Sequence, residues 1–83
     1  MIEEEYMELK KLTDYAIKLS NDMTSALSMT QVYLQNYDYI SAAKWKNKYL
    51  ELSELYKIAI INSVNKNVEL FNKYFPISSE YLN

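Results

Sequence analysis

The fold is decided by residues 9–33, which read LKKLTDYAIKLSNDMTSALSMTQVY. Apolar and small side chains recur in this stretch at alternating intervals of three and four residues, which is the spacing of a helix that packs along another helix. The pattern predicts one amphipathic helix over about residues 3–36. A break at Ser20-Asn21-Asp22 is the alternative, because three cap-forming residues are adjacent there. The residues of this first seam are Leu9, Leu12, Ala16, Leu19, Met23, Ala26, Thr30 and Tyr33.

A turn is expected directly after the first seam, at Asn36-Tyr37-Asp38. Asn36 tolerates left-handed backbone geometry and is expected to close the first helix. Asp38 is expected to cap the N-terminus of the next helix. A second seam with the same spacing then predicts a second helix over residues 39–61. Its residues are Ala42, Trp45, Tyr49, Leu52, Tyr56 and Ala59.

Beyond residue 61 the apolar pattern changes phase. The segment Asn62–Asn67 is rich in poor helix formers, which leaves open a kink or break there and a short third helix after residue 62. Pro76 ends the helical region, because a proline pushes the residue before it toward extended geometry. The expected organisation is a single helical domain over residues 1–75 and a C-terminal tail over residues 76–83, which Ile77, Tyr81 or Leu82 could dock. The apolar residues of the shifted phase are Val64, Val68, Phe71 and Phe75.

These elements predict an all-α fold, an antiparallel hairpin of two long helices. Two amphipathic helices leave one side of each poorly covered, and nine tyrosines, one tryptophan and two phenylalanines are a large apolar load for such a small domain. We therefore expect the hairpin to pair with a second copy into a helical bundle, as a homo-oligomer. The residues expected in the core, rather than at a contact surface, are Leu19, Met23, Tyr49, Leu52 and Tyr56.

The composition excludes most small-site chemistry. Among its 83 residues the chain has no glycine, cysteine, histidine or arginine. These residues supply most phosphate-binding loops, metal ligands, nucleophiles and forked phosphate contacts. We therefore expect no enzymatic activity, no cofactor, and no catalytic or metal site. The acidic cluster Glu3, Glu4, Glu5 and Glu8 has a sufficient structural role, since negative charge complements the dipole at a helix N-terminus.

Charge is distributed unevenly along the chain. Residues 1–43 carry three lysines against seven acidic residues, whereas residues 44–83 carry six lysines against four. The net charges of −4 and +2 favour placing the two halves side by side. No apolar run approaches the roughly 20 residues of a membrane span, and the acidic N-terminus is unlike a secretory signal. We expect a cytoplasmic protein with no membrane partner. Its composition, rich in Asn, Lys, Ile and Tyr and without Arg or Gly, suggests an AT-rich genome, as in a low-GC bacterium, a virus or a mobile element.

Residues 33–52 resemble the middle of a single tetratricopeptide-type helical hairpin. In that family an aromatic residue follows a short turn and a small residue comes three positions later. Here these places are taken by Tyr39, after Asp38, and by Ala42. Tyr37 replaces the usual turn glycine, and there is no second repeat. The resemblance, over about 20 residues, therefore implies an isolated hairpin rather than a solenoid.

The segment around the turn supplies the candidate binding residues. Tyr37 and Tyr39 cannot both enter the core, because residues two apart point in different directions. At least one is expected to be exposed beside Lys46 or Lys48, where it suits a protein-binding patch. The expected function is a small regulator or inhibitor, of viral, phage or mobile-element type, that docks on a host protein. The candidate partner-binding residues are Tyr37, Tyr39, Lys44, Lys46 and Lys48.

Two alternatives remain open from the sequence. The basic and aromatic segment Lys44–Tyr49 could bind nucleic acid, with lysines on the phosphates and rings stacked on the bases. Trp45 near the bend is similar to the tryptophan of secreted WXG-type two-helix proteins, which would imply a secretion-associated partner. In this chain, however, Trp45 lies within the second helix and Lys46 follows it in place of glycine.

Overall fold

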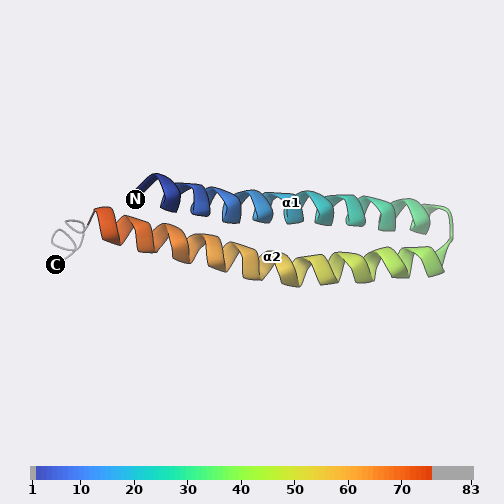
Figure 1. Cartoon of the computed structure of the whole chain (residues 1–83). Helices are drawn as coiled ribbons and strands as arrows, with labels where there is room; N and C mark the ends of the chain where they lie inside the picture. The colour runs from blue at the N-terminus through green and yellow to red at the C-terminus, as the bar shows by residue number, and fades with distance from the viewer. Residues whose placement is uncertain (1, 76–83) are drawn as a thin grey trace.

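The computed structural model describes residues 2–75, which form two helices packed side by side (Figure 1). Helix α1 spans Ile2–Gln35 and helix α2 spans Tyr39–Tyr74. The helices run antiparallel, so the molecule has a turn end at residues 36–38 and an open end where α1 begins and α2 finishes. The predicted all-α hairpin is confirmed. The expected tail, with Ile77, Tyr81 and Leu82, lies outside the described residues.

Both helices are continuous where the sequence left a break open. Helix α1 passes through residues 20–22, and α2 passes through residues 62–67 to Tyr74. Residues 39–61 are helical as predicted, the break left open at residues 62–67 does not occur, and no separate third helix forms within residues 2–75. Poor intrinsic helix formers are tolerated here because packing against α1 outweighs their small propensity penalties.

The turn closes α1 through two backbone hydrogen bonds. The N–H of Asp38 donates to the carbonyl of Tyr33 at 2.9 Å, and the N–H of Tyr37 donates to that of Leu34 at 3.1 Å. This is the Schellman arrangement, which requires a left-handed residue just past the helix. That residue is Tyr37, with φ of 59°, and not Asn36 as the sequence suggested. Asn36 instead donates a side-chain hydrogen bond to the carbonyl of Val32.

Both predicted seams face each other, and every one of their residues is buried or half-buried. The most deeply buried side chains are small, because four of the six are alanines that let the helices approach closely. Leu19 and Leu52 supply the large apolar contacts between these alanines. Met23, Tyr49 and Tyr56 pack against this cluster as half-buried side chains, as does Trp45. The expected core is thus confirmed, although it is narrow.

The seam of α2 does not shift phase after residue 61. Because the helix is unbroken, the three–four spacing continues from Ala59 through Ser63, Lys66 and Leu70, all of which are half-buried. The expected drift of the seam is therefore wrong, since a residue one place out of phase is rotated by about 100° away from α1. The displaced apolar residues instead form an outer stripe, with each side chain at least half exposed: Ile61, Val64, Val68, Phe71 and Phe75.

The hairpin is elongated and exposes much surface. Its radius of gyration is 18.6 Å, whereas a compact domain of this length has about 12 Å. Its accessible surface is 6650 Å², against about 5200 Å² for a globular monomer of the same mass. Within residues 2–75, neither helix has a stretch long and apolar enough to cross a membrane.

Replacing Leu52 by alanine tests the seam. Leu52 is only 8% exposed, so we expect Leu52→Ala to lower the free energy of unfolding by about 2–4 kcal/mol. Leu55→Ala is the matched control, because Leu55 lies on the same helix with its side chain 45% exposed. Urea unfolding followed by circular dichroism measures both. Equal losses for the two variants, or a loss below about 0.5 kcal/mol for Leu52→Ala, would contradict the seam.

Candidate interaction surfaces at the two ends of the hairpin

Three large apolar side chains project from the turn end. Tyr37 is 78% exposed, Tyr39 is 64% exposed and Ile40 is 81% exposed. The expectation that at least one of the two tyrosines is exposed is confirmed, since both are. They cannot fold back onto the seam because the turn places them beyond its last pair of facing residues. The turn end therefore exposes a small apolar surface that contains two aromatic rings.

Asp38 holds the backbone of the turn that carries these side chains. Its carboxylate accepts a hydrogen bond of 3.1 Å from the backbone N–H of Ser41, which caps α2. Hydrogen bonding from Ser41 holds the pKa of Asp38 below its usual value. The carboxylate is thus charged at neutral pH and places a negative charge at the positive end of the helix dipole.

The three candidate lysines do not form one patch. Lys44 and Lys48 line a shallow groove with Ser41 and the aromatic residues Tyr33 and Trp45. Lys46 lies two positions from each of these lysines, and so about 200° around α2 on another face. Tyr37 and Tyr39 are not among the residues that line the groove. The structure therefore separates an aromatic tip, Tyr37 with Tyr39, from a groove flanked by two lysines.

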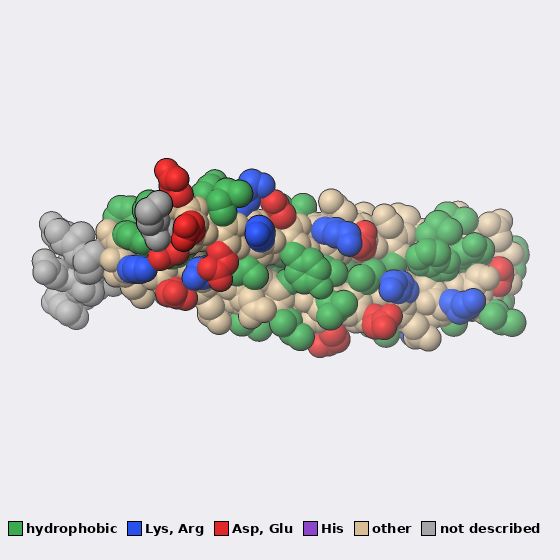
Figure 2. Space-filling model, viewed as in Figure 1, with side chains coloured by type: hydrophobic (Ala, Val, Ile, Leu, Met, Phe, Trp, Pro, Cys, Tyr) green, Lys and Arg blue, Asp and Glu red, His purple; other side chains and the backbone are tan. Residues whose placement is uncertain are grey.

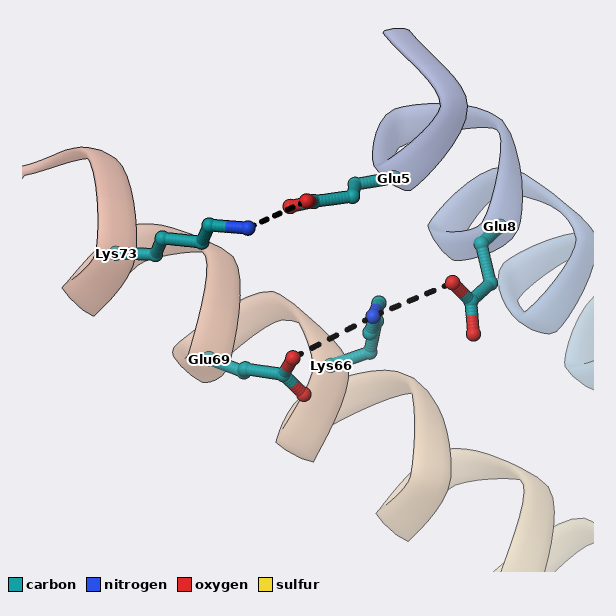
Figure 3. A network of polar contacts seen from close by, with 5 residues as sticks. All are labelled: Glu5, Glu8, Lys66, Glu69 and Lys73. Atoms are coloured by element: carbon teal, nitrogen blue, oxygen red, sulfur yellow. Dashed lines mark hydrogen bonds and ion pairs between the residues drawn. The ribbon is translucent and has the colours of Figure 1, made fainter. Parts of the chain in front are cut away.

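The open end has a different character, because ion pairs there join the two helices (Figure 3). The Nζ of Lys73 lies 2.6 Å from a carboxylate oxygen of Glu5. The Nζ of Lys66 lies 3.3 Å from Glu8 across the helices and 3.5 Å from Glu69 along α2. Lys66 is mostly buried, with a side chain 16% exposed. These contacts occupy places that apolar residues fill nearer the turn.

Each pair favours the charged forms of its members. The hydrogen bond from Lys73 holds the pKa of Glu5 below its usual value, and the pKa of Lys73 is raised by the same bond. The pKa of Lys66 is raised chiefly by Glu8. One further polar contact crosses the seam nearby, a hydrogen bond of 3.1 Å between the hydroxyls of Thr13 and Ser63. The open half of the hairpin is thus held by polar as well as apolar contacts.

Composition indicated that the two halves attract, and the residues involved are now identified. Glu5 and Glu8 belong to the acidic cluster that the helix dipole seemed to explain alone, yet both bind lysines of α2. The sequence contained a signal for these contacts between the helices. Ser63 and Lys66 fall on the continued three–four spacing of α2, which places two polar side chains against α1. Figure 2 shows charged side chains gathered over both helices at the open end on the face in view.

Comparison with known proteins adds no relative. No family model, curated protein or solved structure matches this chain. Within residues 2–75, no group of three or more acidic side chains could hold a metal ion. The surfaces that stand out by their geometry are the aromatic tip, the lysine-flanked groove and the outer stripe of α2.

Replacing Tyr37 by glycine should stabilise the hairpin. A residue with a side chain loses roughly 1–2 kcal/mol of stability at positive φ, and glycine avoids this strain. Part of the gain is offset, because glycine has more conformational freedom to lose when the chain folds. We expect Tyr37→Gly to raise the free energy of unfolding by about 0.5–1 kcal/mol. Tyr39→Gly is the control, because Tyr39 begins α2, where glycine destabilises. A destabilised Tyr37→Gly in urea unfolding would contradict the turn geometry.

The open end should loosen in acid. Because the pKa of Glu5 is lowered on folding, its stabilisation is complete above the usual value of 4.5 and is lost as the pH falls through the lowered pKa. The contributions of Lys66 and Lys73, whose pKa values are raised, are complete below 10.5 and are lost as the pH rises through their folded values.

Carbon chemical shifts measured from pH 7 to pH 2 check the acid response. Residues 2–9 and 66–74 should lose helicity at low pH while the middle of the hairpin, around Ala26 and Leu52, keeps it. Glu5→Gln is the control, since it removes the titrating group and should weaken the response. An open end that is as helical at pH 2 as at pH 7 would show that the ion pairs contribute nothing.

Proposed function

We propose that this protein is a small, non-enzymatic helical interaction module that docks on another protein through its aromatic tip. The two packed helices place Tyr37 and Tyr39 at one end of the molecule, outside the core of the hairpin. The setting that suits its size and composition is a regulator or inhibitor from a virus, phage or mobile element. It would act in the cytoplasm of the producing or host cell.

The observation that carries the proposal is the conformation of Tyr37. This residue has a φ of 59°, where a tyrosine is strained and a glycine or asparagine is not, and its side chain is 78% exposed. The ring therefore gains little from packing within the hairpin. The turn requires a left-handed residue at position 37 but does not require a tyrosine, so the presence of tyrosine there supports a role in binding.

The chemistry of the tip suits a protein partner. Tyrosine offers a large rigid surface with a hydroxyl at its edge, and it is enriched among the residues that dominate binding energy at interfaces. Ile40, the most exposed of the large apolar side chains, lies beside it in sequence and extends the apolar area. The capping contact of Asp38 holds the backbone under these side chains, which lowers the entropy lost on binding.

Nucleic acid is the second candidate, and the groove beside Trp45 is the observation that favours it. Tyr33 and Trp45 present rings between Lys44 and Lys48, as in sites that stack bases while lysines hold the phosphates. Two observations weaken this candidate: Lys48 also pairs with Glu51 at 3.9 Å, and Lys46 lies on another face. Two lysines neutralise few phosphates.

Capture of a partner from host lysate with tip variants tests the proposal. Tyr39→Ala should reduce the captured protein at least about tenfold, if the tyrosine is a dominant contact. Tyr37→Gly should do the same while making the hairpin more stable, which separates binding from folding. Tyr15→Ala is the matched control, since Tyr15 is an exposed tyrosine in the middle of α1. If all three variants capture the same protein as strongly as the parent, the tip is not the binding site.

The same preparation tests nucleic acid. If the groove binds it, Lys44→Glu with Lys48→Glu should abolish binding to a single-stranded oligonucleotide, whereas Lys46→Glu should have a smaller effect. Affinity should also fall steeply as salt is raised. Binding that is unchanged in the double variant would exclude the groove.

A further inference from the structure

The outer stripe of α2 has the spacing of a second helix-packing seam. Its residues follow one another at intervals of three, four, three and four, from Ile61 to Phe75, and each is 50–57% exposed. This is the same heptad spacing that joins α1 to α2. The stripe lies on the outer side of α2, because its residues are out of phase with Ala59, Ser63 and Lys66. At its C-terminal end, Phe71 and Phe75 also line a shallow groove with Ile2, Tyr6 and Leu9 of α1.

The stripe itself also contains no charged residue. Between residues 58 and 75 the charged residues are Lys66, Glu69 and Lys73. All three take part in the ion-pair network, Lys66 and Lys73 with α1 and Glu69 with Lys66 along α2, although the side chains of Glu69 and Lys73 stay 65% and 55% exposed. The rest of the outward surface of this segment consists of apolar side chains and asparagines. A partner with charged side chains would have to desolvate them here without compensation.

A second copy of the same chain meets this requirement. We infer that two copies pair through their outer stripes, with the α2 helices antiparallel and Val68 at the two-fold axis. This inference rests on the proposed function, a module expected to self-associate, and it identifies the surface through which the copies pair. The interface is isologous, which means that the same residues of both copies form it.

Side-chain size favours the antiparallel orientation. About Val68, the antiparallel pairing places Phe71 against the partner's Val64 and Phe75 against the partner's Ile61, so that large side chains meet smaller ones. A parallel pairing would instead set each phenylalanine against its own copy. It would also bring Lys57, one step before the stripe in the same phase, against the partner's Lys57.

The hairpin exposes more surface than a globular monomer, and such a dimer would bury part of that excess. The surface of 6650 Å² exceeds that of a globular monomer of this mass by roughly 1400 Å². A stable dimer of standard size buries about 800 Å² on each partner. Pairing over 61–75 leaves both turn ends free and pointing in opposite directions, so that the dimer would present two aromatic tips.

Cysteine crosslinking tests the pairing directly, because the chain has no cysteine of its own. Under mild oxidation Val68→Cys should form a disulfide-linked dimer efficiently. Ile61→Cys alone should not, whereas a mixture of Ile61→Cys and Phe75→Cys chains should. Val32→Cys, an exposed position on α1, is the control for random collision. Equal crosslinking at Val68 and Val32 would overturn the proposal, and efficient crosslinking by Ile61→Cys alone would overturn the antiparallel orientation.

Sedimentation equilibrium of the full chain gives an independent readout. Val68→Lys should raise the dissociation constant of the dimer at least about tenfold, since it buries an unpaired ammonium against an apolar stripe. Val32→Lys should leave it unchanged, and circular dichroism should report equal helix content for both. A full-length parent chain that is monomeric at tens of micromolar would overturn the pairing. A monomeric Val68→Lys that still captures its partner through Tyr39 would leave the proposed function intact.

Discussion

Two helices can cover only one stripe of each other, and the rest of this structure follows from that constraint. The stripe is set by a three–four spacing that begins in α1 and continues without a fault to Leu70 in α2. Alanines at the closest approaches, such as Ala26 and Ala42, let the backbones come near, and leucines fill the intervals. Every large side chain out of phase with this spacing is left partly in water, which is why the hairpin exposes so much apolar surface.

The turn-proximal half of the fold was predictable because all levels of the sequence agree there. The seam from Leu9 to Tyr33 and the seam from Ala42 to Ala59 are apolar, correctly spaced and free of proline and glycine. The cap at Asp38 was predictable for the same reason. The left-handed residue was misplaced by one position, because the Schellman hydrogen bonds, and not residue preference, decide that Tyr37 takes it.

The second half of α2 was not predictable from hydrophobic pattern alone. A pattern that assigns apolar residues to the core places Val64 and Val68 inward, whereas the unbroken helix places Ser63 and Lys66 there. The polar residues are accepted because Thr13 and Glu8 satisfy them from α1. The exposure of a tyrosine at the turn was predicted correctly, since both Tyr37 and Tyr39 are exposed. Their separation from the lysines required the angular positions of side chains around α2, which composition does not reveal.

The two ends of the hairpin therefore differ in ways that suit different contacts. The turn end offers two tyrosines on a fixed backbone, and the open half offers a neutral stripe on the outside of α2. At the open end Lys66 and Lys73 of α2 pair with Glu8 and Glu5 of α1, and the outer stripe itself contains no charged residue. We propose that the outer stripe joins copies of the chain and that the aromatic tip joins a different protein.

Helix α2 keeps its phase beyond residue 61, with Lys66 facing α1 and Val68 facing away. Isotope-filtered methyl NOE spectroscopy on a mixture of labelled and unlabelled chains tests this orientation most directly. Within one chain, Leu9 methyls should contact Leu70, with which they share a groove, and should not contact Val68. Apart from contacts with the neighbouring Val64 and Phe71 on the same helix, Val68 methyls should show contacts only between chains. Strong contacts within one chain from Val64 or Val68 to Leu9 or Leu12 would show that α2 is rotated and would contradict the account.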